Sequence, residues 1–583
     1  MGITVLESLQ TLREAAALDH LDAAFGDWMA RWGGEPVALA AALICAETAR
    51  GHVYLDLATA GEMLAEHQLE APANWAKTLR ESRAVTSDDT PAPLVLETER
   101  LYLHRYWHYE TRIAKQLRAL ATPVPDLDIE TLQAALREES ARPAPAGNKL
   151  DRQRLAAVLG ASRRLAIISG GPGTGKTTTV KRLVKLARRL EPDLTVALAA
   201  PTGKAAARLA EAADALGVKP QTVHRLLGYH PATQHLRHDA EHPIAADLIV
   251  VDEASMVDIG LMARLLEALP ATGRLVLVGD RNQLASVEVG VVFGDICQAA
   301  QGFPAPEAET LERCLGAAVP KADQAVSPLS TGIALLRHNY RYGEGGIGAL
   351  ADAVLSGSED NAFEVVQRDQ ASDHPSLAWQ SCPDKRALDA MLRQAVARWF
   401  KPVLAASNPA AALAALQRFR LLAAERHGVF GVEGLNTRIE QLLGLNAAER
   451  WYAGRPVLIT ENDREIEVFN GDFGILWPDE HGHMRLWLET PGDAPPRTLS
   501  PACLPAHETA WALTVHKAQG SEFQGVALVL PPRDSRVATR ELLYTGLTRA
   551  RETVAVWATE AALRAAIRRR IRRASGLAER LAP

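Results

Sequence analysis

Short apolar runs alternate with longer amphipathic stretches from about residue 146 onwards. Four of these runs read, in order, LAIIS, TVALAA, DLIVV and RLVLVG. Continuous apolar runs of this length are typical of strands that are buried on both faces, and their alternation with helical stretches is typical of β-α-β units. The pattern therefore predicts a parallel α/β domain that begins near residue 146.

The pattern before residue 146 is different. Residues 1–118 read as helical, with stretches such as PVALAAALICAETARG, and they end in the aromatic-rich LYLHRYWHYETRIAKQLRAL. The segment 119–145 contains TPVPDLD and ARPAP, and prolines at this density interrupt helices and mark domain boundaries. We predict a helical N-terminal domain at 1–118 and a linker at 119–145.

The second half of the chain predicts a further α/β domain with an insertion. The first α/β domain is expected at 146–330, and the second at 331–449 and 509–583, with a strand candidate at 419–424. Residues 450–508 contain the runs RPVLIT, REIEVF, FGILW and MRLWLET, with an Asn-Gly turn signal after the second run. This part predicts a small antiparallel β-barrel of the SH3-like kind, inserted into the second α/β domain.

The amino-acid composition narrows the class of protein. The chain has 583 residues, of which 47% are hydrophobic and 23% charged, and its net charge is −6. This balance is that of a soluble protein with several domains. The five cysteines are scattered without a C-x-x-C pair, and the first residues lack the basic start of a secretory signal, so a cytoplasmic protein without a membrane span is expected. The net charge does not decide whether nucleic acid binds, because binding depends on where Lys and Arg gather.

The run LAIIS leads into a glycine-rich segment that matches G-x-x-x-x-G-K-[ST] in full. Glycines let backbone N–H groups curve around phosphate oxygens, and the following helix points its positive end at them. A glycine-rich turn that binds nothing is the alternative, but the flanking strand and helix argue against it. The segment predicts an ATP and Mg²⁺ site made of Gly170, Gly171, Pro172, Gly173, Thr174, Gly175, Lys176, Thr177 and Thr178.

Two acids follow another buried run. Residues 248–251 read LIVV and are followed by Asp252 and Glu253. One carboxylate at the end of a strand can hold magnesium, and its neighbour can polarise the water that attacks a phosphate. Acids at strand ends are common, but on a second parallel strand after the phosphate loop they predict a magnesium ligand, Asp252, and a general base, Glu253. Upstream, the amide of Gln153 fits either an adenine edge or an exposed helix position.

Further segments complete a series. In chain order GGPGTGKTT, APTGKAAARL, VVDEAS, GDRNQL, NYR, TVHKAQGSEF and YTGLTRAR resemble the motifs of superfamily 1 helicases. Each alone has an ordinary interpretation, such as a surface lysine for Lys204 or Lys517 and a turn residue for Gln283. Their number and order favour the resemblance. VDEASMVD, TVHKAQGSEF and LLYTGLTRAR are similar to the RecD type in particular, and the resemblance spans most of the chain.

This resemblance implies two RecA-like P-loop domains and a role for each matching residue. Lys176 and Thr177 would bind phosphates and Mg²⁺, with Asp252 on the metal. The remaining implied roles are Glu253 as catalytic base, Gln283 as sensor of the γ-phosphate, Arg341 and Arg549 as arginine fingers from the second domain, Glu522 near the ribose, Gln153 near the base, and Thr202, Lys204, His516 and Ser521 facing the DNA strand.

The function implied by the resemblance is that of an ATP-dependent 5′-3′ DNA helicase. It would act on single-stranded DNA at duplex ends, in double-strand break repair by homologous recombination, as one subunit of a heterotrimer with RecB-like and RecC-like subunits. Because no paired acids with a nearby lysine stand outside the helicase motifs, nuclease activity is expected in another subunit. A stand-alone helicase of the longer related type would carry helix-hairpin-helix repeats, for which residues 1–145 show no signal. A nucleotide-switched DNA-binding ATPase that does not translocate is the third possibility.

Two further stretches have two interpretations each. Six arginines near the C-terminus could contact phosphates or an acidic partner, or form a solvated helix face. The aromatics of LYLHRYWHYE could stack on bases, although a core or a partner interface is favoured. The arginines are Arg564, Arg568, Arg569, Arg570, Arg572 and Arg573.

Overall fold

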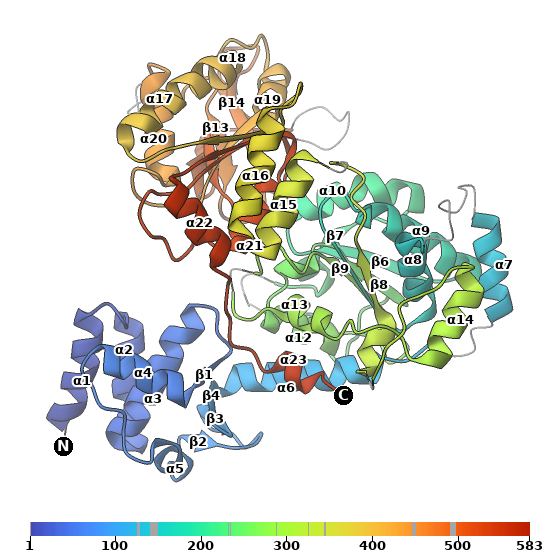
Figure 1. Ribbon diagram of the computed structural model, residues 1–583, viewed down its shortest axis with the longest axis vertical. Helices are drawn as coiled ribbons and strands as arrows, with labels where there is room; N and C mark the ends of the chain where they lie inside the picture. Colours follow the sequence, from blue (N-terminus) through green and yellow to red (C-terminus); the bar gives the residue numbers. More distant parts are fainter. Residues whose placement is uncertain are drawn as a thin grey trace.

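The computed structural model describes residues 2–124, 129–139, 150–230, 233, 235–286, 288–324, 326–342, 345–445, 450–463, 465–489 and 497–583. An N-terminal region lies beside two α/β domains that contact each other (Figure 1). The prolines of the expected linker, Pro143 and Pro145, lie outside the described residues.

The N-terminal region is mainly helical, as expected, but it also contains a small sheet with strand order β1-β4-β3-β2. The strands β3 and β4 form a tight antiparallel pair whose connecting turn includes Thr98 at a positive φ of 58°. The sequence analysis missed this sheet because its strands are two to four residues long. The elements are α1 (Gly2–Glu14), α2 (His20–Met29), α3 (Gly34–Ala49), β1 (Tyr54–Asp56), α4 (Leu57–Glu66), α5 (Trp75–Arg80), β2 (Val85–Thr86), β3 (Leu94–Glu97), β4 (Arg100–Leu103) and α6 (His104–Leu120).

The first α/β domain contains a six-stranded parallel sheet in the order β10-β5-β9-β8-β6-β7. Alternate residues of β5 point into two separate apolar cores on opposite faces of the sheet. This double burial explains the continuous apolar runs. Its strands are β5 (Leu165–Gly170), β6 (Val196–Ala200), β7 (Gln221–Thr222), β8 (Leu248–Val251), β9 (Arg274–Gly279) and β10 (Ile333–Leu336). Its helices are α7 (Ile129–Glu139), α8 (Arg152–Ser162), α9 (Lys176–Leu190), α10 (Gly203–Ala213), α11 (Val223–Leu226), α12 (Ile259–Glu267), α13 (Val292–Gln298) and α14 (Ala305–Leu315).

The second α/β domain contains a five-stranded parallel sheet in the order β11-β20-β19-β12-β18. The strand expected at 419–424 is β12. The strands are β11 (Leu377–Gln380), β12 (Phe419–Ala423), β18 (Ala512–Thr514), β19 (Phe523–Val529) and β20 (Ala550–Trp557). The helices are α15 (Gly346–Ser356), α16 (Glu359–Gln370), α17 (Lys385–Ala395), α18 (Lys401–Leu404), α19 (Pro409–Gln417), α20 (Val432–Leu442), α21 (Arg540–Leu547) and α22 (Glu560–Arg568).

The inserted segment forms a five-stranded antiparallel sheet in the order β16-β15-β14-β13-β17. Within the expected strand REIEVF, residues 465–467 form a turn instead, and an isolated bridge joins Asp463 and Val468 on either side of it. Within the described residues β16 and β17 do not pair, so closure into an SH3-like barrel stays a prediction. The strands are β13 (Pro456–Ile459), β14 (Phe473–Pro478), β15 (Met484–Leu488), β16 (Arg497–Leu499) and β17 (His507–Thr509).

Three elements cross the expected domain boundaries. Strand β10 was placed in the second domain, but it pairs with β5 and completes the edge of the first sheet. Helix α7 was placed in the linker, but its buried leucines pack in a core of the first domain. Helix α6 was placed in the N-terminal domain, yet it shares a core with α12 and β8 of the first α/β domain. The N-terminal region and the first domain are therefore joined by continuous packing.

The C-terminal tail runs from the second α/β domain to a position beside α6, next to the first α/β domain (Figure 1). After α22 the chain leaves the second α/β domain, and the short helix α23 (Leu577–Arg580) packs against α6. The fully buried carboxylate of Glu110 accepts hydrogen bonds from the Gly576 backbone N–H (2.8 Å) and from Arg580 Nε (3.1 Å). The tail was expected to belong wholly to the second domain, but these contacts bind its end to the first domain and to the N-terminal region.

The C-terminal arginines do not form a single helix face, because α22 ends at Arg568. Arg564 pairs with Asp360 (2.7 Å), and Arg569 pairs with Asp534 (2.6 Å). Arg573 donates to the carbonyls of Glu288 and Gly290 in the first domain. These three arginines are therefore paired within the protein, and the stretch does not form a continuous phosphate-binding surface.

Candidate active site

A cavity of about 450 Å³ lies between the two α/β domains. Its walls come from stretches of the chain that are far apart in sequence, and they include the phosphate loop, both acids that follow β8, and residues that follow β9, β10 and β18. The lining residues are Gly171, Pro172, Gly173, Gly175, Lys176, Thr177, Lys181, Ala205, Arg208, Leu209, Asp252, Glu253, Gln283, Arg341, Gly520, Glu522 and Arg549.

The phosphate loop joins β5 to the N-terminus of α9. Gly173 and Gly175 have φ values of 80° and 82°, which only glycine adopts without strain, and they turn the loop into a cradle. Lys176 Nζ lies within 2.8 Å of the Gly170 carbonyl oxygen and 3.3 Å of that of Gly171, so the ammonium is held at the mouth of the loop. The N-terminus of α9 adds its positive end to the same point. The loop is suited to bind a phosphate group.

The two acids lie opposite this loop. Burial, with the Glu253 carboxylate beside it, raises the pKa of Asp252 to about 6, while the Lys176 ammonium opposes the shift. Glu253 stands at φ 51°, an unusual backbone conformation for a residue with a side chain, and its Oε2 atom is buried without a hydrogen-bond partner. A strained backbone and an unpaired oxygen at a cavity wall are typical of a functional carboxylate.

The donor set fits Mg²⁺. Within the described residues no group of three or more His, Cys, Asp or Glu could hold a metal without other ligands. Magnesium, however, binds readily through one or two protein oxygens together with phosphate oxygens and water. The Thr177 hydroxyl and the Asp252 carboxylate both line the cavity, and Glu253 Oε2 offers an unpaired acceptor beside them.

Two arginines reach the cavity by different routes. Arg549, at the end of α21, is 2% exposed and is held by the carbonyl oxygens of Thr545 (3.0 Å) and Ser521 (3.4 Å). Arg341 was expected in the second domain, but it lies in the connector between β10 and α15. One of its terminal nitrogens, Nη2, binds Glu522 at 2.8 Å, and the other, Nη1, is buried without a partner. An unpaired, buried guanidinium nitrogen at a cavity of this kind is suited to an anionic ligand.

Glu522 binds three arginines. It is paired with Arg341, with Arg551 (3.0 Å) and, across the domain boundary, with Arg208 of α10 (3.1 Å). Burial alone would raise the pKa of Glu522, but the guanidinium groups of Arg208 and Arg341 hold it at about 2. Glu522 therefore stays ionised, and it ties the connector and α10 to the second domain.

The other nucleotide candidates lie beside the cavity. Gln153 is buried, and its Nε2 donates to the Thr174 carbonyl oxygen at 3.0 Å, so the amide supports the phosphate loop and does not line the cavity. Thr174 Oγ1 donates to the Gly171 carbonyl oxygen at 2.7 Å within the loop. Thr178 is exposed in the first turn of α9 and also does not line the cavity.

The four DNA candidates differ in their surroundings. Thr202 caps the start of α10 through a 3.2 Å bond from the Ala205 backbone N–H. Lys204 lies 3.8 Å from Glu489, next to the inserted sheet, and burial lowers its pKa against the effect of that carboxylate. Burial likewise lowers the pKa of His516, which lies near the tail arginine Arg573. Ser521 is 3% exposed.

Four further residues belong to the site although the sequence analysis did not single them out. Arg208, Asp280, Asn339 and Tyr544 all lie in or next to the recognised motif segments. Asn339 Nδ2 donates to the Pro172 carbonyl oxygen at 3.0 Å, so the connector contacts the phosphate loop directly. The sequence signal that could have identified them was their position in those motif segments, but only the folded chain shows which of them reach the cavity.

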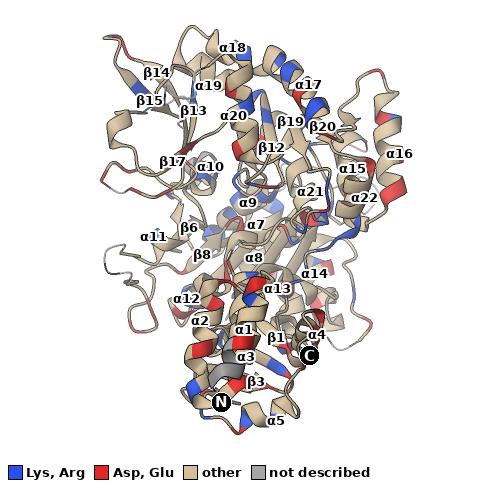
Figure 2. Cartoon of the chain, turned by 90° about the vertical axis from the view of Figure 1, so that its left-hand side faces the viewer, with Lys and Arg blue, Asp and Glu red and all other residues tan. Residues whose placement is uncertain are grey.

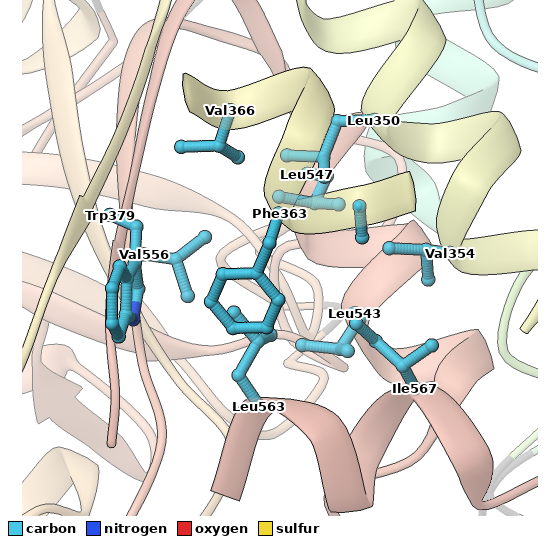
Figure 3. Close-up of a pocket in the computed structure, with 11 residues that line it drawn as sticks. Leu350, Val354, Phe363, Val366, Trp379, Leu543, Leu547, Val556, Leu563 and Ile567 are labelled. Carbon is cyan, nitrogen blue, oxygen red and sulfur yellow. The ribbon is translucent and has the colours of Figure 1, made fainter. Parts of the chain in front are cut away.

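A second, apolar pocket lies inside the second α/β domain (Figure 3). Its volume is about 10 Å³, which is close to the space that one water molecule needs. Phe363 stands at its centre, among side chains that include Leu543, Leu563 and Ile567 (Figure 3). We regard this pocket as a packing defect of the core.

Figure 2 shows Lys and Arg distributed over the chain together with Asp and Glu. Across the described part of the chain, every helix is too short or too polar to serve as a membrane span.

Comparison with known proteins agrees with this geometry. Family models match residues 14–102 ("RecBCD enzyme subunit RecD, N-terminal domain"), 153–289 ("AAA domain") and 509–557 ("UvrD-like helicase C-terminal domain"). Solved structures with some similarity to this chain include a Bacteroides Pif1 helicase in complex with ADP-AlF3 and single-stranded DNA. It is 17% identical, with 71% of this chain and 92% of that chain covered and a TM-score of 0.35.

Curated relatives cover almost the whole chain. RecBCD enzyme subunit RecD of Mycobacterium tuberculosis is 36% identical over 98% of this chain and 96% of its own length. The RecD subunit of Haemophilus influenzae is 32% identical over 87% of this chain and 84% of its own. The ATP-dependent RecD2 DNA helicase of Deinococcus radiodurans is 32% identical over 95% of this chain and 70% of its own. On these matches, and with its phosphate loop, acids and arginines gathered at one cavity, the chain belongs to the RecD family of helicases.

Proposed function

We propose that the chain is an ATP-dependent DNA helicase that moves 5′ to 3′ along one strand as a subunit of a RecBCD-type complex. The observation that carries this proposal is the cavity between the α/β domains. It gathers Lys176, Asp252 and Glu253 from the first domain and Arg549 from the second, so one ligand can bridge both domains.

The residues that line the cavity suggest a separate role for each in ATP hydrolysis. Lys176 would bind the β- and γ-phosphates, and Glu253 would orient and deprotonate the attacking water. Thr177 and Asp252 would hold Mg²⁺, which supplies charge neutralisation at the phosphates when bound. Arg549 would stabilise the charge that develops in the transition state, as would Arg341.

The position of the arginines suggests how hydrolysis moves the domains. Arg549 approaches the phosphate loop only when the second domain closes on the first, so closure completes the site and loss of the phosphate permits opening. A cycle of closing and opening between two domains that both contact DNA produces one step along the strand. The 5′-to-3′ direction rests on the RecD resemblance alone.

DNA-stimulated ATP hydrolysis tests this function. We expect single-stranded DNA to raise the ATP turnover of the full chain severalfold or more. A turnover that is the same with and without DNA would instead support the nucleotide-switched binding protein. The hypothesis of a RecBCD-type subunit is favoured over a stand-alone helicase for two reasons. The M. tuberculosis RecD is 36% identical to this chain and the D. radiodurans RecD2 is 32% identical, and residues 14–102 match the model of the RecD N-terminal domain.

Affinity for single-stranded DNA should depend on salt. Each phosphate contact released should contribute about 0.7 log unit of affinity per log unit of salt. If Lys204 faces the strand, Lys204→Ala should reduce this slope by about 0.7, whereas Lys185→Ala, on the exposed side of α9, should not change it. Fluorescence anisotropy over a salt series measures the slope. An unchanged slope for Lys204→Ala would remove Lys204 from the DNA path.

The N-terminal region supports a docking role, and we propose that it binds the RecC-like subunit. Three of the six exposed large hydrophobic side chains of the described residues, Leu21, Trp28 and Trp32, lie within one segment of twelve residues, with exposures of 70%, 43% and 41%. Trp28 stacks on Phe25 and meets Trp32 edge to face, with centroids 6.2 and 4.7 Å apart. Exposed aromatic clusters of this kind often anchor protein interfaces.

Changing this cluster should weaken the complex without unfolding the chain. We expect Trp28→Ala with Trp32→Ala to weaken binding of the RecC-like subunit by about thirtyfold or more, since buried aromatic anchors commonly contribute about 2 kcal/mol or more. Val429→Ala with Val537→Ala, on exposed positions of the second α/β domain, is the matched control. Deletion of 1–118 is a poorer test, because it removes α6 from the core of the first domain. Wild-type affinity of the double tryptophan variant would place the docking surface elsewhere.

A further inference from the structure

The loop that carries Gln283 is held by the second α/β domain. This loop, residues 280–284, follows β9 of the first domain. At one end Tyr544 Oη donates to Asp280 Oδ2 at 2.9 Å. At the other end the Leu284 backbone N–H donates to Thr545 Oγ1 (2.9 Å), and its carbonyl accepts from Gln519 Nε2 (3.0 Å). Every one of these bonds crosses the boundary between the domains, so a movement of the second domain acts on the loop directly.

Asp280 is the shared partner in this arrangement. Its Oδ2 atom accepts from Tyr544 Oη and also from Gln283 Nε2, at 3.2 Å. Asp280 is 1% exposed and Tyr544 4%, so water does not replace either donor. Burial raises the pKa of Asp280, and the nearby Lys176 ammonium opposes that shift. A buried carboxylate of this kind depends on its donors, and the bond from Gln283 is the longer of the two.

Tyr544 also touches the phosphate loop. A Cβ atom placed on Gly171 would lie 2.6 Å from Tyr544 Oη, so the hydroxyl rests against the loop backbone, and only glycine leaves room for it. One hydroxyl of the second domain therefore contacts both the loop that binds phosphate and the carboxylate that binds Gln283. A tyrosine whose only role was to fill space in the core would need neither the contact with Gly171 nor the hydrogen bond to Asp280.

We propose that Tyr544 is a positioning residue that links the Gln283 amide to closure of the two domains. Asp280 Oδ2 accepts from both donors in this structure, so with Tyr544 in place the carboxylate keeps a donor when the Gln283 amide turns into the cavity toward the nucleotide. When the second domain moves away, Asp280 loses that donor and retains the amide. Closure of the two domains therefore lets the Gln283 amide contact the nucleotide, and opening returns the amide to Asp280. This inference rests on the proposed function, because it assigns a role within the ATPase cycle.

Tyr544→Phe tests the role, because it keeps the ring and removes only the hydroxyl. We expect the kcat of DNA-stimulated ATP hydrolysis to fall about tenfold or more, as for loss of a hydrogen bond to a charged group, with KM for ATP changed less than threefold. Tyr452→Phe is the control, since it removes another buried hydroxyl, which belongs to the inserted segment, is bonded to Glu440 and Trp511 and does not line the cavity. It should keep the parent kcat.

The double variant separates positioning from simple loss of packing. Asp280→Asn weakens the hold on Gln283 because the acceptor loses its charge. Added to Tyr544→Phe, it should restore part of the lost kcat, so that the two changes are not additive. Additive losses, or a parent-like kcat for Tyr544→Phe in a chain that hydrolyses ATP with DNA, would overturn this inference alone. Absence of DNA-stimulated hydrolysis in the unaltered chain would overturn the proposed function.

Discussion

Lys176→Ala is expected to abolish ATP hydrolysis and DNA unwinding while leaving the fold intact. The Lys176 ammonium lies at the mouth of the phosphate loop, within 2.8 Å of the Gly170 carbonyl oxygen, and we expect its charge to be used on the phosphates. Its side chain lines a cavity and does not fill a core, so its removal should leave the thermal midpoint of unfolding nearly unchanged. Phosphate release and a thermal melt, measured on the same preparation, check both parts.

Lys185→Ala is the matched control for this variant. Lys185 is on the same helix, α9, but it is exposed and does not line the cavity. Near-normal ATP turnover of Lys176→Ala would contradict the assignment of the phosphate loop as the ATP site. Equal losses of turnover in both variants would point to damage of α9.

Arg549→Ala and Arg341→Ala should each lower ATP turnover by a factor on the order of 10³, with nucleotide binding largely retained. Both guanidinium groups face the cavity from outside the phosphate-loop domain, and an arginine finger acts mainly on the transition state. Nucleotide affinity measured with a fluorescent ATP analogue, together with steady-state kcat, separates binding from catalysis. A variant that loses affinity but keeps its maximal rate would contradict the finger role.

Because Arg549 is buried, a milder variant accompanies the alanine. Arg549→Lys keeps the positive charge but cannot reproduce the planar set of donors that binds the carbonyls of Thr545 and Ser521. It should also show reduced kcat in a folded chain. Arg551→Ala, on an exposed side chain of the neighbouring strand, removes one partner of Glu522 and should lower kcat only a few fold.

Local patterns predicted the parts of this site that depend on local geometry. The phosphate loop, the acids after β8 and the parallel strands β5, β6, β8, β9 and β12 are each encoded in a short stretch of sequence, and each was identified from its local pattern. Short strands were harder. The strands β3 and β4 were missed, and REIEVF was predicted as a strand. Residues 333–336 were placed in the second domain, although they form β10, which pairs with β5.

Contacts between distant parts of the chain could not be read from local patterns. Tyr544 and Asp280 are 264 residues apart, and Arg580 and Glu110 are 470 residues apart. Each pair joins residues that would be ordinary in isolation, namely a tyrosine in a helix, an acid after a strand and a charge in a tail. Only the packing of one domain on another makes them partners.

Unwinding of tailed duplexes tests the central claim most directly. The full chain, with ATP and Mg²⁺, is given a labelled duplex with a 5′ single-stranded tail or the same duplex with a 3′ tail, and strand separation is followed by fluorescence. The account predicts that the 5′-tailed duplex is unwound, that the 3′-tailed duplex is not, and that Lys176→Ala unwinds neither. Unwinding of the 3′-tailed duplex alone, or equal unwinding by Lys176→Ala, would contradict it.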